Sequence, residues 1–573
     1  LLRQQFPRDP GSYAHVSESM SVHCRVCVID VMKTYWLVLW SLWAARLVRQ
    51  PTLPVRVTGG WLRGVVAPDG SHKRYMAVPF ATHPVKRFQG PGPEPIWQGV
   101  LEAIEENVRC LQRIGKSILI GQEDCLIMNI YTPVDATAYS KYPVMVYIHG
   151  GGFYEGSSTG FLYGPEYLVT KGVILVVMNY RLNIQGLACL KIKEAPGNGA
   201  MKDQLAALKW IQRNIEAFGG DPNSVTISGE SAGAASVSFH ILSPMSKGLF
   251  HRAIIQSGSS LVPWTLQFRP VYMASLLTKV MGHTTDDLYE IYNILMEKSD
   301  RDLIVTRVPR RQGHTITSEL LYTPCIEDEI PGVEPFLTEM PYDLLSSGRY
   351  NKVPVLIGRT SSEGLLFANL ENDTTSYKIM FEKTLPKNWH VPEESKRKEI
   401  GAKLKELYFG DNVISYNTLV NLSQLYGEVY FSSGVLQETE LYLNTSDKPI
   451  YSYVFSYDGR RNIVKWTLDH GLNTAPGATH ADELFYLFQQ PLLPSFFEGM
   501  MIDRVTTMWT NFVKYGEPTP EVTDLLPVKW LPSNKSSPHS FVIDREFSTI
   551  PLWPTDSFKY LRDIYSKYRR KTD

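Results

Sequence analysis

Gly229-Glu230-Ser231-Ala232-Gly233 is the stretch of this sequence that decides the fold. Residues 224–228 (SVTIS) before it predict a short buried strand, and residues 234–242 (AASVSFHIL) after it predict a buried helix. Because glycine has no Cβ, the flanking glycines allow a serine to be held in a sharp, strained turn between strand and helix. Such a turn exposes the Ser231 hydroxyl and directs the helix N-terminus at any oxyanion formed there.

A glycine-rich loop lies upstream of this turn. Residues 144–148 (VMVYI) predict a buried strand that runs directly into His149-Gly150-Gly151-Gly152-Phe153. Consecutive glycines allow backbone N–H groups to approach a substrate closely and to converge on one point. Such a loop supplies oxyanion donors together with the N–H of the residue after a nucleophile, which is Ala232 here. A flexible glycine turn is the alternative interpretation.

A serine hydroxyl becomes a useful nucleophile only when a base takes its proton, and a carboxylate must fix the tautomer of that base. His480 is the candidate base, because it lies in a loop (GATHADELF, 477–485) at the edge of an apolar run. Glu363 is a candidate acid, because it follows the predicted strand 353–358, and open α/β sheets place their chemistry at the carboxyl ends of strands. Asp482 and Glu483 are rivals by proximity to His480, and spacing alone leaves this choice open.

The chain resembles the type-B carboxylesterase family, which also contains the cholinesterases, from about Val55 to Leu561. Four segments carry the resemblance: 123–131 (EDCLIMNIY), 179–182 (NYRL), 198–204 (NGAMKDQ) and 218–222 (FGGDP). The residues to which the resemblance gives a role are the nucleophile Ser231, the acid Glu363, the base His480, the oxyanion donors Gly151, Gly152 and Ala232, and Trp264, which lines the acyl pocket.

The resemblance implies an α/β-hydrolase fold, with a mixed, mostly parallel central sheet flanked by helices and large cap insertions. We expect strands near 144–149, 173–180, 225–228, 253–257, 353–358 and 450–457, and helices near 199–218, 231–242 and 498–515. The long excursions at about 265–350 and 370–445 are expected to cap the site.

The activity that the resemblance implies is hydrolysis of carboxylic esters through an acyl-enzyme, without a metal or an organic cofactor. The expected substrates are small-molecule esters, including xenobiotic, odorant or pheromone esters. The family also contains non-catalytic ligand-binding and adhesion proteins, which typically lose triad members. Cholinesterases carry a tryptophan in their first disulfide loop, and the segment from Cys110 to Cys125 has none. Juvenile hormone esterases usually have glutamine where Glu230 stands.

The sequence departs from the family pattern at several positions. Asn183 replaces a usual glycine and is followed by Gln185, and Ala188-Cys189 replaces a usual Phe-Leu pair. The segment 81–88 is about two residues short. These departures concern local packing rather than the triad.

Composition agrees with a large enzyme. The 573 residues include 58 Lys and Arg and 58 Asp and Glu, so the formal net charge is zero and nothing favours a nucleic acid or an anionic membrane as partner. The 31 Tyr, 23 Phe and 12 Trp residues are either an ordinary large core or partly the lining of an apolar gorge.

The first residues predict a targeting segment. We interpret residues 1–31 as upstream read-through or a misassigned start, residues 32–50 as a signal peptide and residues 51–573 as a single catalytic domain. The apolar run from Tyr35 to Ala45 is too short to span a bilayer, so a secreted protein without a stable membrane anchor is expected, with a signal anchor as the alternative.

The cysteines and the predicted glycosylation motifs agree with a secreted protein. The resemblance implies a disulfide between Cys110 and Cys125, whereas Cys189 and Cys325 have no matching family partners and are expected to be buried free thiols. No metal or redox role is expected for the C-x-x-C of Cys24 and Cys27. The predicted glycosylation sites are Asn372, Asn421, Asn444 and Asn534.

Overall fold

The computed structural model describes residues 34–37, 40–41, 50–84, 86–105, 107–115, 117–316, 322–371, 378–494 and 496–572. The predicted segment 1–31, with Cys24 and Cys27, lies outside these residues. Within the predicted signal peptide, residues 34–37 and 40–41 are helical.

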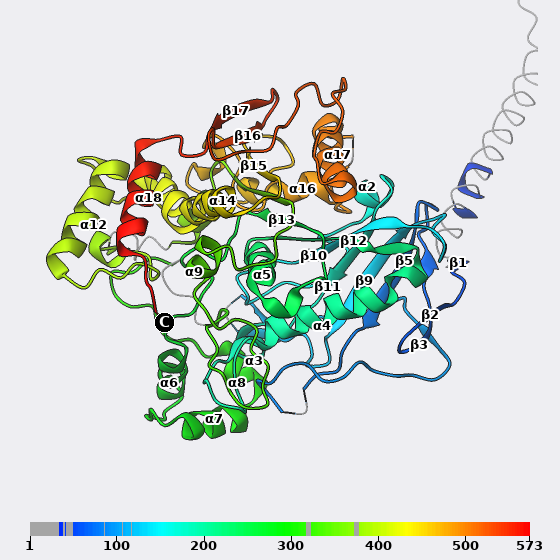
Figure 1. Ribbon diagram of the computed structural model, residues 1–573, viewed down its shortest axis with the longest axis horizontal. Coiled ribbons are helices and arrows are strands. Elements are labelled where there is room, and N and C mark those ends of the chain that lie inside the picture. The colour runs from blue at the N-terminus through cyan, green and yellow to red at the C-terminus, as the bar shows by residue number, and fades with distance from the viewer. Residues whose placement is uncertain are drawn as a thin grey trace, which may run out of the picture.

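Within the described residues, a 12-stranded mixed sheet runs through the molecule in the order β1-β4-β5-β9-β11-β10-β12-β13-β14-β15-β16-β17 (Figure 1). The neighbours from β11 to β16 pair in parallel, and antiparallel strands complete both edges. The strands are β1 Gln50–Pro51, β4 Val65–Val66, β5 His72–Pro79, β9 Ile127–Pro133, β10 Tyr142–Ile148, β11 Ile174–Met178, β12 Gly220–Glu230, β13 Arg252–Gln256, β14 Val355–Thr360, β15 Ile450–Phe455, β16 His539–Ile543 and β17 Ser548–Pro551.

Two small sheets lie beside the large one in the N-terminal part of the described chain. Their strands are β2 Val55–Val57, β3 Gly60–Arg63 and β6 Val100–Glu102 in one, and β7 Gln112–Ile114 and β8 Ile118–Ile120 in the other.

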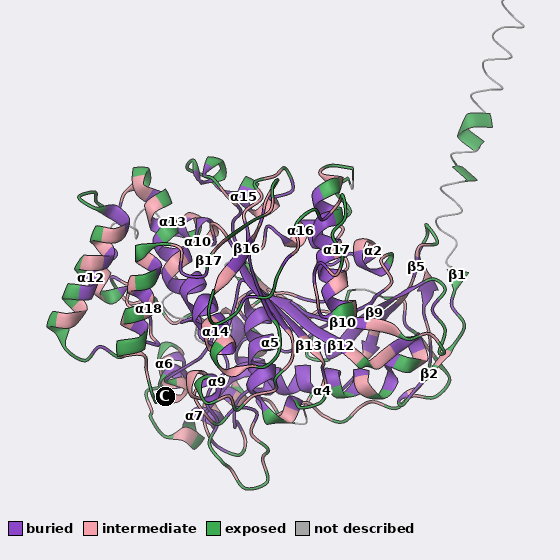
Figure 2. Cartoon of the chain, turned by 45° about the horizontal axis from the view of Figure 1, so that its top comes forward, coloured by how far each residue is buried: buried purple, intermediate pink, exposed green. Residues whose placement is uncertain are grey.

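Helices cover both faces of the sheet, which explains why the central strands are continuously apolar. In β10, Val144 and Val146 belong to one hydrophobic cluster with residues of α4 (Gly199–Asn214) and α5 (Ala232–Leu242). The alternate residues Met145 and Tyr147 belong to a second cluster with α2 (Glu166–Val169) and α17 (Gly499–Tyr515). Figure 2 shows these strands as a buried centre between the layers.

The regular elements of the two expected excursions are mainly helices, which lie in the left half of Figure 1. The first contains α6 Pro270–Val280, α7 Leu288–Glu297, α8 Asp300–Val305 and α9 Pro341–Ser346. The second and its approaches contain α10 Leu365–Leu370, η3 Phe381–Lys383, α12 Glu394–Phe409, η4 Tyr416–Thr418, α13 Leu419–Gly427, the π-helix η5 Glu428–Ser432 and α14 Ser433–Thr445.

The remaining helices are short connections and the C-terminal element. They are α3 Asn183–Leu187, η1 Ile215–Phe218, η2 Pro244–Ser246, α15 Ile463–Trp466, η6 Leu472–Thr474, α16 Leu484–Leu487 and α18 Asp556–Tyr568.

The structure refines two predicted boundaries around the Ser231 turn. The predicted strand 225–228 is part of the longer β12, which begins at Gly220. The predicted helix 199–218 ends as an α-helix at Asn214 and continues as the 3-10 turn η1. This tighter turn ends at Gly219, whose φ of 88° lets the chain reverse into the strand.

The expectation that Cys189 and Cys325 are free thiols was wrong. They form a disulfide, in addition to the predicted bond between Cys110 and Cys125. The side chain of Asn198 fixes Cys325 in place, because its Nδ2 donates to Cys325 O and its Oδ1 accepts the Cys325 N–H, both at 2.9 Å. Replacement of the family's usual residue by Cys189 therefore brings a covalent bond between the segment that follows α3 and the first excursion.

Asn183 accounts for another departure from the family pattern. Its φ is 54°, a left-handed conformation that glycine adopts freely and asparagine tolerates better than most residues. Its Nδ2 donates to Tyr154 O at 2.9 Å, so the side chain also holds the segment that follows the glycine loop.

Candidate active site

Ser231 lies between the end of β12 and the start of α5, with φ 58° and ψ −121°. These angles are sparsely populated by residues other than glycine, so the surrounding structure must hold the turn in place. The Ser231 N–H donates to Gln256 O at 2.9 Å, which ties the turn to the neighbouring strand β13. The strained turn expected from the sequence is therefore present.

Close backbone approaches explain the glycines around Ser231. A Cβ on Gly233 would lie 2.0 Å from Ile148 O, and one on Gly229 would lie 2.5 Å from the carbonyl carbon of Gly233. A Cβ on Gly258 would lie 2.2 Å from Ser231 O. The turn is thus packed between β10 and the loop after β13 without room for a side chain at these positions.

Ser231, His480 and Glu363 form one hydrogen-bonded chain. The distance from Ser231 Oγ to His480 Nε2 is 2.8 Å, and the distance from His480 Nδ1 to Glu363 Oε2 is 2.6 Å. In a neutral imidazole, Nδ1–H donates to the carboxylate and Nε2 accepts from the serine hydroxyl, which is the tautomer that a general base needs. The Thr360 N–H donates to Glu363 Oε1 at 2.8 Å and orients the carboxylate.

The two rival acids have other partners. Asp482 Oδ2 accepts the Thr479 N–H at 2.8 Å, and its Oδ1 accepts the Lys465 N–H at 3.3 Å. Glu483 Oε1 accepts from Gln256 Nε2 at 3.3 Å. Both carboxyl groups therefore support the His480 loop and neither takes the place of Glu363 at Nδ1.

Glu230 is a neighbour of the site to which sequence reasoning gave no role. Its Oε1 lies 3.1 Å from His480 Nε2, and its side chain is buried. Burial raises the pKa of Glu230 to about 7, and the charge of His480 opposes this rise. Its position directly before Ser231 was the available signal, but sequence does not show that its side chain turns toward the imidazole.

The carboxyl groups close to His480 determine the direction in which its pKa is shifted. Burial alone would lower the pKa of His480, but the charges of Glu230 and Glu363 and the hydrogen bond to Glu363 raise it to about 9. Burial alone would raise the pKa of Glu363, but the His480 contact and the Thr360 N–H hold it below its usual value. The buried carboxyl groups around His480 therefore stabilise the protonated form of its imidazole relative to burial alone.

The glycine loop presents backbone donors next to Ser231. The φ values of Gly151 and Gly152 are 99° and 61°, and among the described residues neither N–H donates a hydrogen bond. Ala232 is the first residue of α5, so its N–H has no partner within the helix. A side-chain hydrogen bond holds the loop, since His149 Nδ1 lies 2.9 Å from Gly150 O.

His149 itself is suited to that support. Burial lowers its pKa to about 4, so the ring is neutral at physiological pH and its Nδ1–H can donate to the Gly150 carbonyl. The ring stacks on Tyr180 at a centroid distance of 4.4 Å. The peptide between Gly150 and Gly151, which carries the Gly151 N–H, is therefore held from its carbonyl side.

Aromatic rings border the imidazole. The ring centroids of Phe431 and Phe367 lie 4.8 and 5.3 Å from that of His480. Trp264 packs on Phe431 at 5.4 Å, and its Nε1 donates to Tyr430 O at 3.0 Å. The structure thus brings Trp264 to the same apolar side of the site as Phe431, a residue that sequence reasoning did not single out.

The predicted sequons differ in their surroundings. Asn444 and Asn534 are exposed, whereas Asn421 is partly buried and its Nδ2 donates to Tyr408 O at 2.8 Å. Asn372 lies outside the described residues.

In the part of the chain that the structure describes, no group of three or more His, Cys, Asp or Glu side chains is arranged to hold a metal ion.

Comparison with known proteins identifies the relatives of this arrangement. The model of the carboxylesterase family matches residues 51–555. The chain belongs to the carboxylesterase family. It is 35% identical to esterase FE4 of Myzus persicae, over 81% of this chain and 83% of the relative, and 31% identical to juvenile hormone esterase of Heliothis virescens, over 84% and 88%.

A solved structure shows the same fold. The crystal structure of juvenile hormone esterase from Manduca sexta, with OTFP covalently attached, matches with a TM-score of 0.74 and 27% identity, covering 91% of this chain and 99% of that one. The predicted α/β-hydrolase fold and carboxylic ester hydrolase activity are therefore confirmed. Among the described residues, no helix is both long and apolar enough to cross a membrane.

Proposed function

We propose that this carboxylesterase cleaves esters with Ser231 as nucleophile, His480 as general base and Glu363 as the acid that orients it. The observation that carries this assignment is the hydrogen-bonded chain from Ser231 Oγ through His480 to Glu363 Oε2, held at a strained turn between β12 and α5. Ser231 attacks the ester carbonyl while His480 Nε2 takes the hydroxyl proton. Glu363 stabilises the imidazolium that results.

The N–H groups of Gly151, Gly152 and Ala232 receive the developing oxyanion. Supporting this part of the proposal, a Cβ built on the adjoining Gly150 would lie 3.1 Å from Ser231 Cβ, Ala232 directly follows the serine, and the three N–H groups make no other hydrogen bond among the described residues. His480 then protonates the departing alcohol, and the acyl group remains on Ser231 Oγ. In the second half-reaction His480 activates water, which releases the carboxylic acid and restores the serine.

The test of this assignment is Ser231→Ala. Its kcat for an aryl acetate is expected to fall by a factor on the order of 10⁶ if the triad acts as a unit. An organophosphate should label Ser231 in the wild-type enzyme and leave Ser257 and Ser259 unlabelled. Labelling at either of these two serines in place of Ser231 would contradict the assignment.

The substrates that the site favours are esters with an apolar acyl group, among them xenobiotic, odorant or pheromone esters. The rings of Phe367, Phe431 and Trp264 on one side of His480 support this preference. A series of aryl esters that differ only in acyl length tests it through kcat/KM. Replacing Phe431 by a smaller residue enlarges the pocket and should shift the kcat/KM ranking toward longer acyl groups, and an unchanged ranking would contradict the role of this wall.

Juvenile hormone is a specific substrate to test in the same assay, because the two relatives named above from Heliothis virescens and Manduca sexta are juvenile hormone esterases. Glu230 stands where those enzymes usually have glutamine, so we expect general aryl esters to be turned over with higher kcat/KM than juvenile hormone. The reverse ranking would place this chain with the hormone esterases.

Export is a separate part of the proposal. We infer that residues 32–50 are removed as a signal peptide, that residues 51–573 form the secreted enzyme and that the exposed Asn444 and Asn534 carry glycans. Expressed in a secretory host, the enzyme should appear in the medium, begin near residue 51 and shrink on deglycosylation. An intact segment 32–50 in the membrane fraction would instead favour a signal anchor.

A further inference from the structure

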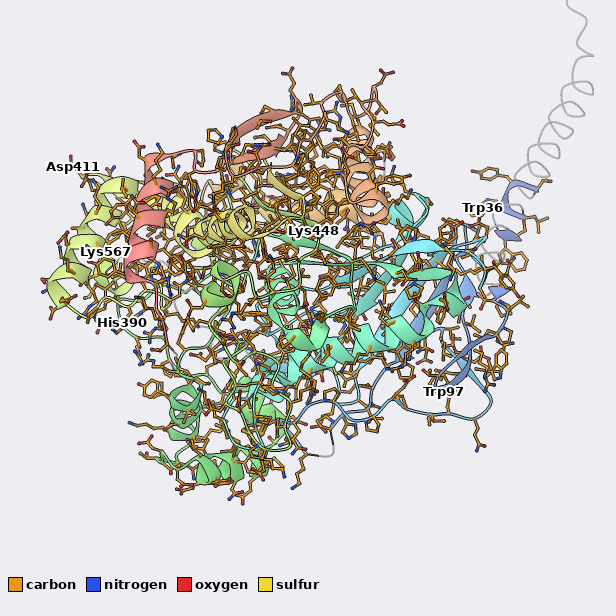
Figure 3. All side chains as sticks on the ribbon, viewed as in Figure 1. Trp36, Trp97, His390, Asp411, Lys448 and Lys567 are labelled. Carbon is orange, nitrogen blue, oxygen red and sulfur yellow. A yellow bond between two sulfur atoms is a disulfide. The ribbon has the colours of Figure 1, made fainter. Side chains whose placement is uncertain are left out.

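A cavity of about 300 Å³ with a cationic lining lies in the cap, and Ser231, Glu363 and His480 are not among its lining residues. Its walls come from the residue before α6, the loop 311–314, the segment from η3 to the start of α12, and the chain after α18. Figure 3 labels His390, which directly follows the lining residue Trp389, at this side of the molecule between α12 and α6. The cationic lining residues are Arg269, Arg311, Lys383, Lys387, Arg397 and Arg570.

Counter-charges are few in this cavity. Glu382 is the one carboxylate among its described lining residues, and His314 is the one imidazole. Among the described residues, Arg269, Lys383, Arg397 and Arg570 form no salt bridge. The described lining of the cavity therefore contains more cationic than anionic side chains.

Neutral groups hold these cations in position. Arg397 Nη1 donates to the carbonyls of Val391 and Pro392 at 2.9 and 2.6 Å. Arg570 Nε donates to Lys387 O at 3.1 Å. Because carbonyl dipoles fix the guanidinium groups without neutralising them, their charge stays available to a ligand.

Aromatic rings bring guanidinium groups together. Arg269 and Arg311 lie over the same Tyr272 ring, 4.8 and 5.7 Å from its centroid. Arg570 lies over Phe268 at 5.3 Å. Burial and the nearby charge of Arg269 lower the pKa of Arg570, which is the sign of like-charge repulsion between the two. A bound anion would relieve that repulsion.

The rest of the lining is apolar and includes Leu385, Pro386, Trp389 and Val391. Trp389 and Val391 are buried side chains of the large hydrophobic cluster, so this wall is rigid. A ligand that satisfies both parts of the cavity has one anionic group and a compact apolar body. The volume is at the small end of the range for small-molecule sites.

We propose that this cavity is a binding site for a small organic carboxylate, with its anionic group at Arg269 and Arg570 and its apolar part on Trp389. Carboxylates of this kind are also the acid products of ester hydrolysis, so the enzyme's own reaction supplies ligands of the right class. The site is distinct from the acyl side of the catalytic centre. Between them stands Tyr430, whose OH donates to Thr384 O at 2.5 Å and whose carbonyl accepts from Trp264 Nε1.

The experiment measures binding of naphthoate to the full enzyme by calorimetry, after Ser231 has been blocked with a dialkyl phosphoryl group. Blocking removes turnover and leaves the cap cavity untouched. We expect saturable binding that the double variant Arg269→Gln/Arg570→Gln weakens by about tenfold or more, because the charged partners of the carboxylate are lost. Arg269→Gln alone, a change at an exposed side chain, should weaken it in the same direction.

Two controls make the result specific. Lys279→Gln removes the same charge from an exposed position on α6 that does not line the cavity, and it should leave binding unchanged. The neutral naphthamide should bind at least about tenfold more weakly than naphthoate, since it cannot pair with the guanidinium groups.

Three results would overturn the proposal. They are no saturable binding of naphthoate to the blocked enzyme, binding that is equal in wild type and in Arg269→Gln, and equal affinity for naphthoate and naphthamide. Inorganic phosphate provides a further comparison, because it has the charge without the apolar body. Binding of phosphate as tight as that of naphthoate would contradict the role of Trp389. Retained activity of the unblocked variants on an aryl acetate would show that they are folded.

Discussion

Glu363 is the described carboxylate that hydrogen-bonds His480 Nδ1, and its partner on the other side is the Thr360 N–H. We expect Glu363→Gln to fold normally and to lower kcat by a factor on the order of 10⁴, because the amide stabilises the imidazole tautomer whose Nε2 cannot accept the serine proton. Asp482→Asn is the matched control, since its carboxyl group binds backbone N–H groups. Steady-state kinetics check both variants, and a larger loss in Asp482→Asn would show that the acid is assigned wrongly.

Glu230 gives a second residue-scale prediction, in the pH dependence. The carboxylate 3.1 Å from His480 Nε2 favours the protonated imidazole and contributes to the raised pKa of about 9. A general base must be unprotonated, so activity is lost as pH falls through the pKa of His480. Glu230→Gln removes the negative charge, lowers this pKa and should move the acidic limb of the kcat/KM profile to lower pH.

The control for this pH shift is Glu216→Gln, which removes an exposed carboxylate outside the site. Its profile should overlie that of the wild type. An acidic limb that stays in place in Glu230→Gln, or moves to higher pH, would mean that Glu230 does not act on the imidazole through its charge.

At the scale of elements, the glycine loop after β10 packs closely against the turn before α5, so side chains cannot be added there without a clash. A Cβ on Gly151 would lie 2.1 Å from Glu155 O, and the φ of Gly151 is 99°. We expect Gly151→Ala to displace the Gly151 N–H and to lower kcat by about 10²–10³, the effect of losing one oxyanion donor. The KM for an aryl acetate should change much less than kcat.

Gly282→Ala is the matched control for backbone strain. Gly282 has a similar φ of 94°, but nothing lies within 4 Å of a Cβ built on it. It should lose stability without losing kcat. Equal kcat in Gly151→Ala and wild type would exclude the Gly151 N–H as an oxyanion donor.

At the scale of the whole molecule, the disulfide between Cys189 and Cys325 closes a much longer loop than the one between Cys110 and Cys125. The sequence separations are 136 and 15 residues. In the chain-entropy model, the longer loop corresponds to about 5 kcal/mol and the shorter to about 3 kcal/mol of stabilisation. We therefore expect Cys189→Ser/Cys325→Ser to lower Tm more than Cys110→Ser/Cys125→Ser.

Thermal unfolding without reductant measures this difference. Both double variants keep serine as a small polar replacement, so each serves as the control for the other. A Tm of Cys189→Ser/Cys325→Ser equal to that of the wild type would show that the second disulfide contributes nothing to stability.

Local patterns in the sequence were enough to predict the strands of the central sheet and the turn that carries Ser231. Strands buried on both faces are continuous apolar runs, so segments such as β10 and β13 stand out from their surroundings, and the glycines around Ser231 mark a turn that only such residues allow. The family segments between 123 and 222 then gave the fold, the activity and candidate partners for the serine.

Only the tertiary structure decided which distant groups meet. Ser231 and His480 are 249 residues apart, and Glu363 and His480 are 117 apart, so sequence spacing by itself could not separate Glu363 from Asp482 and Glu483. The contact of Glu230 with the imidazole and the bond between Cys189 and Cys325 were missed for the same reason. Periodicity reports which face of an element is buried, whereas the partner across a packed interface depends on how the whole chain folds.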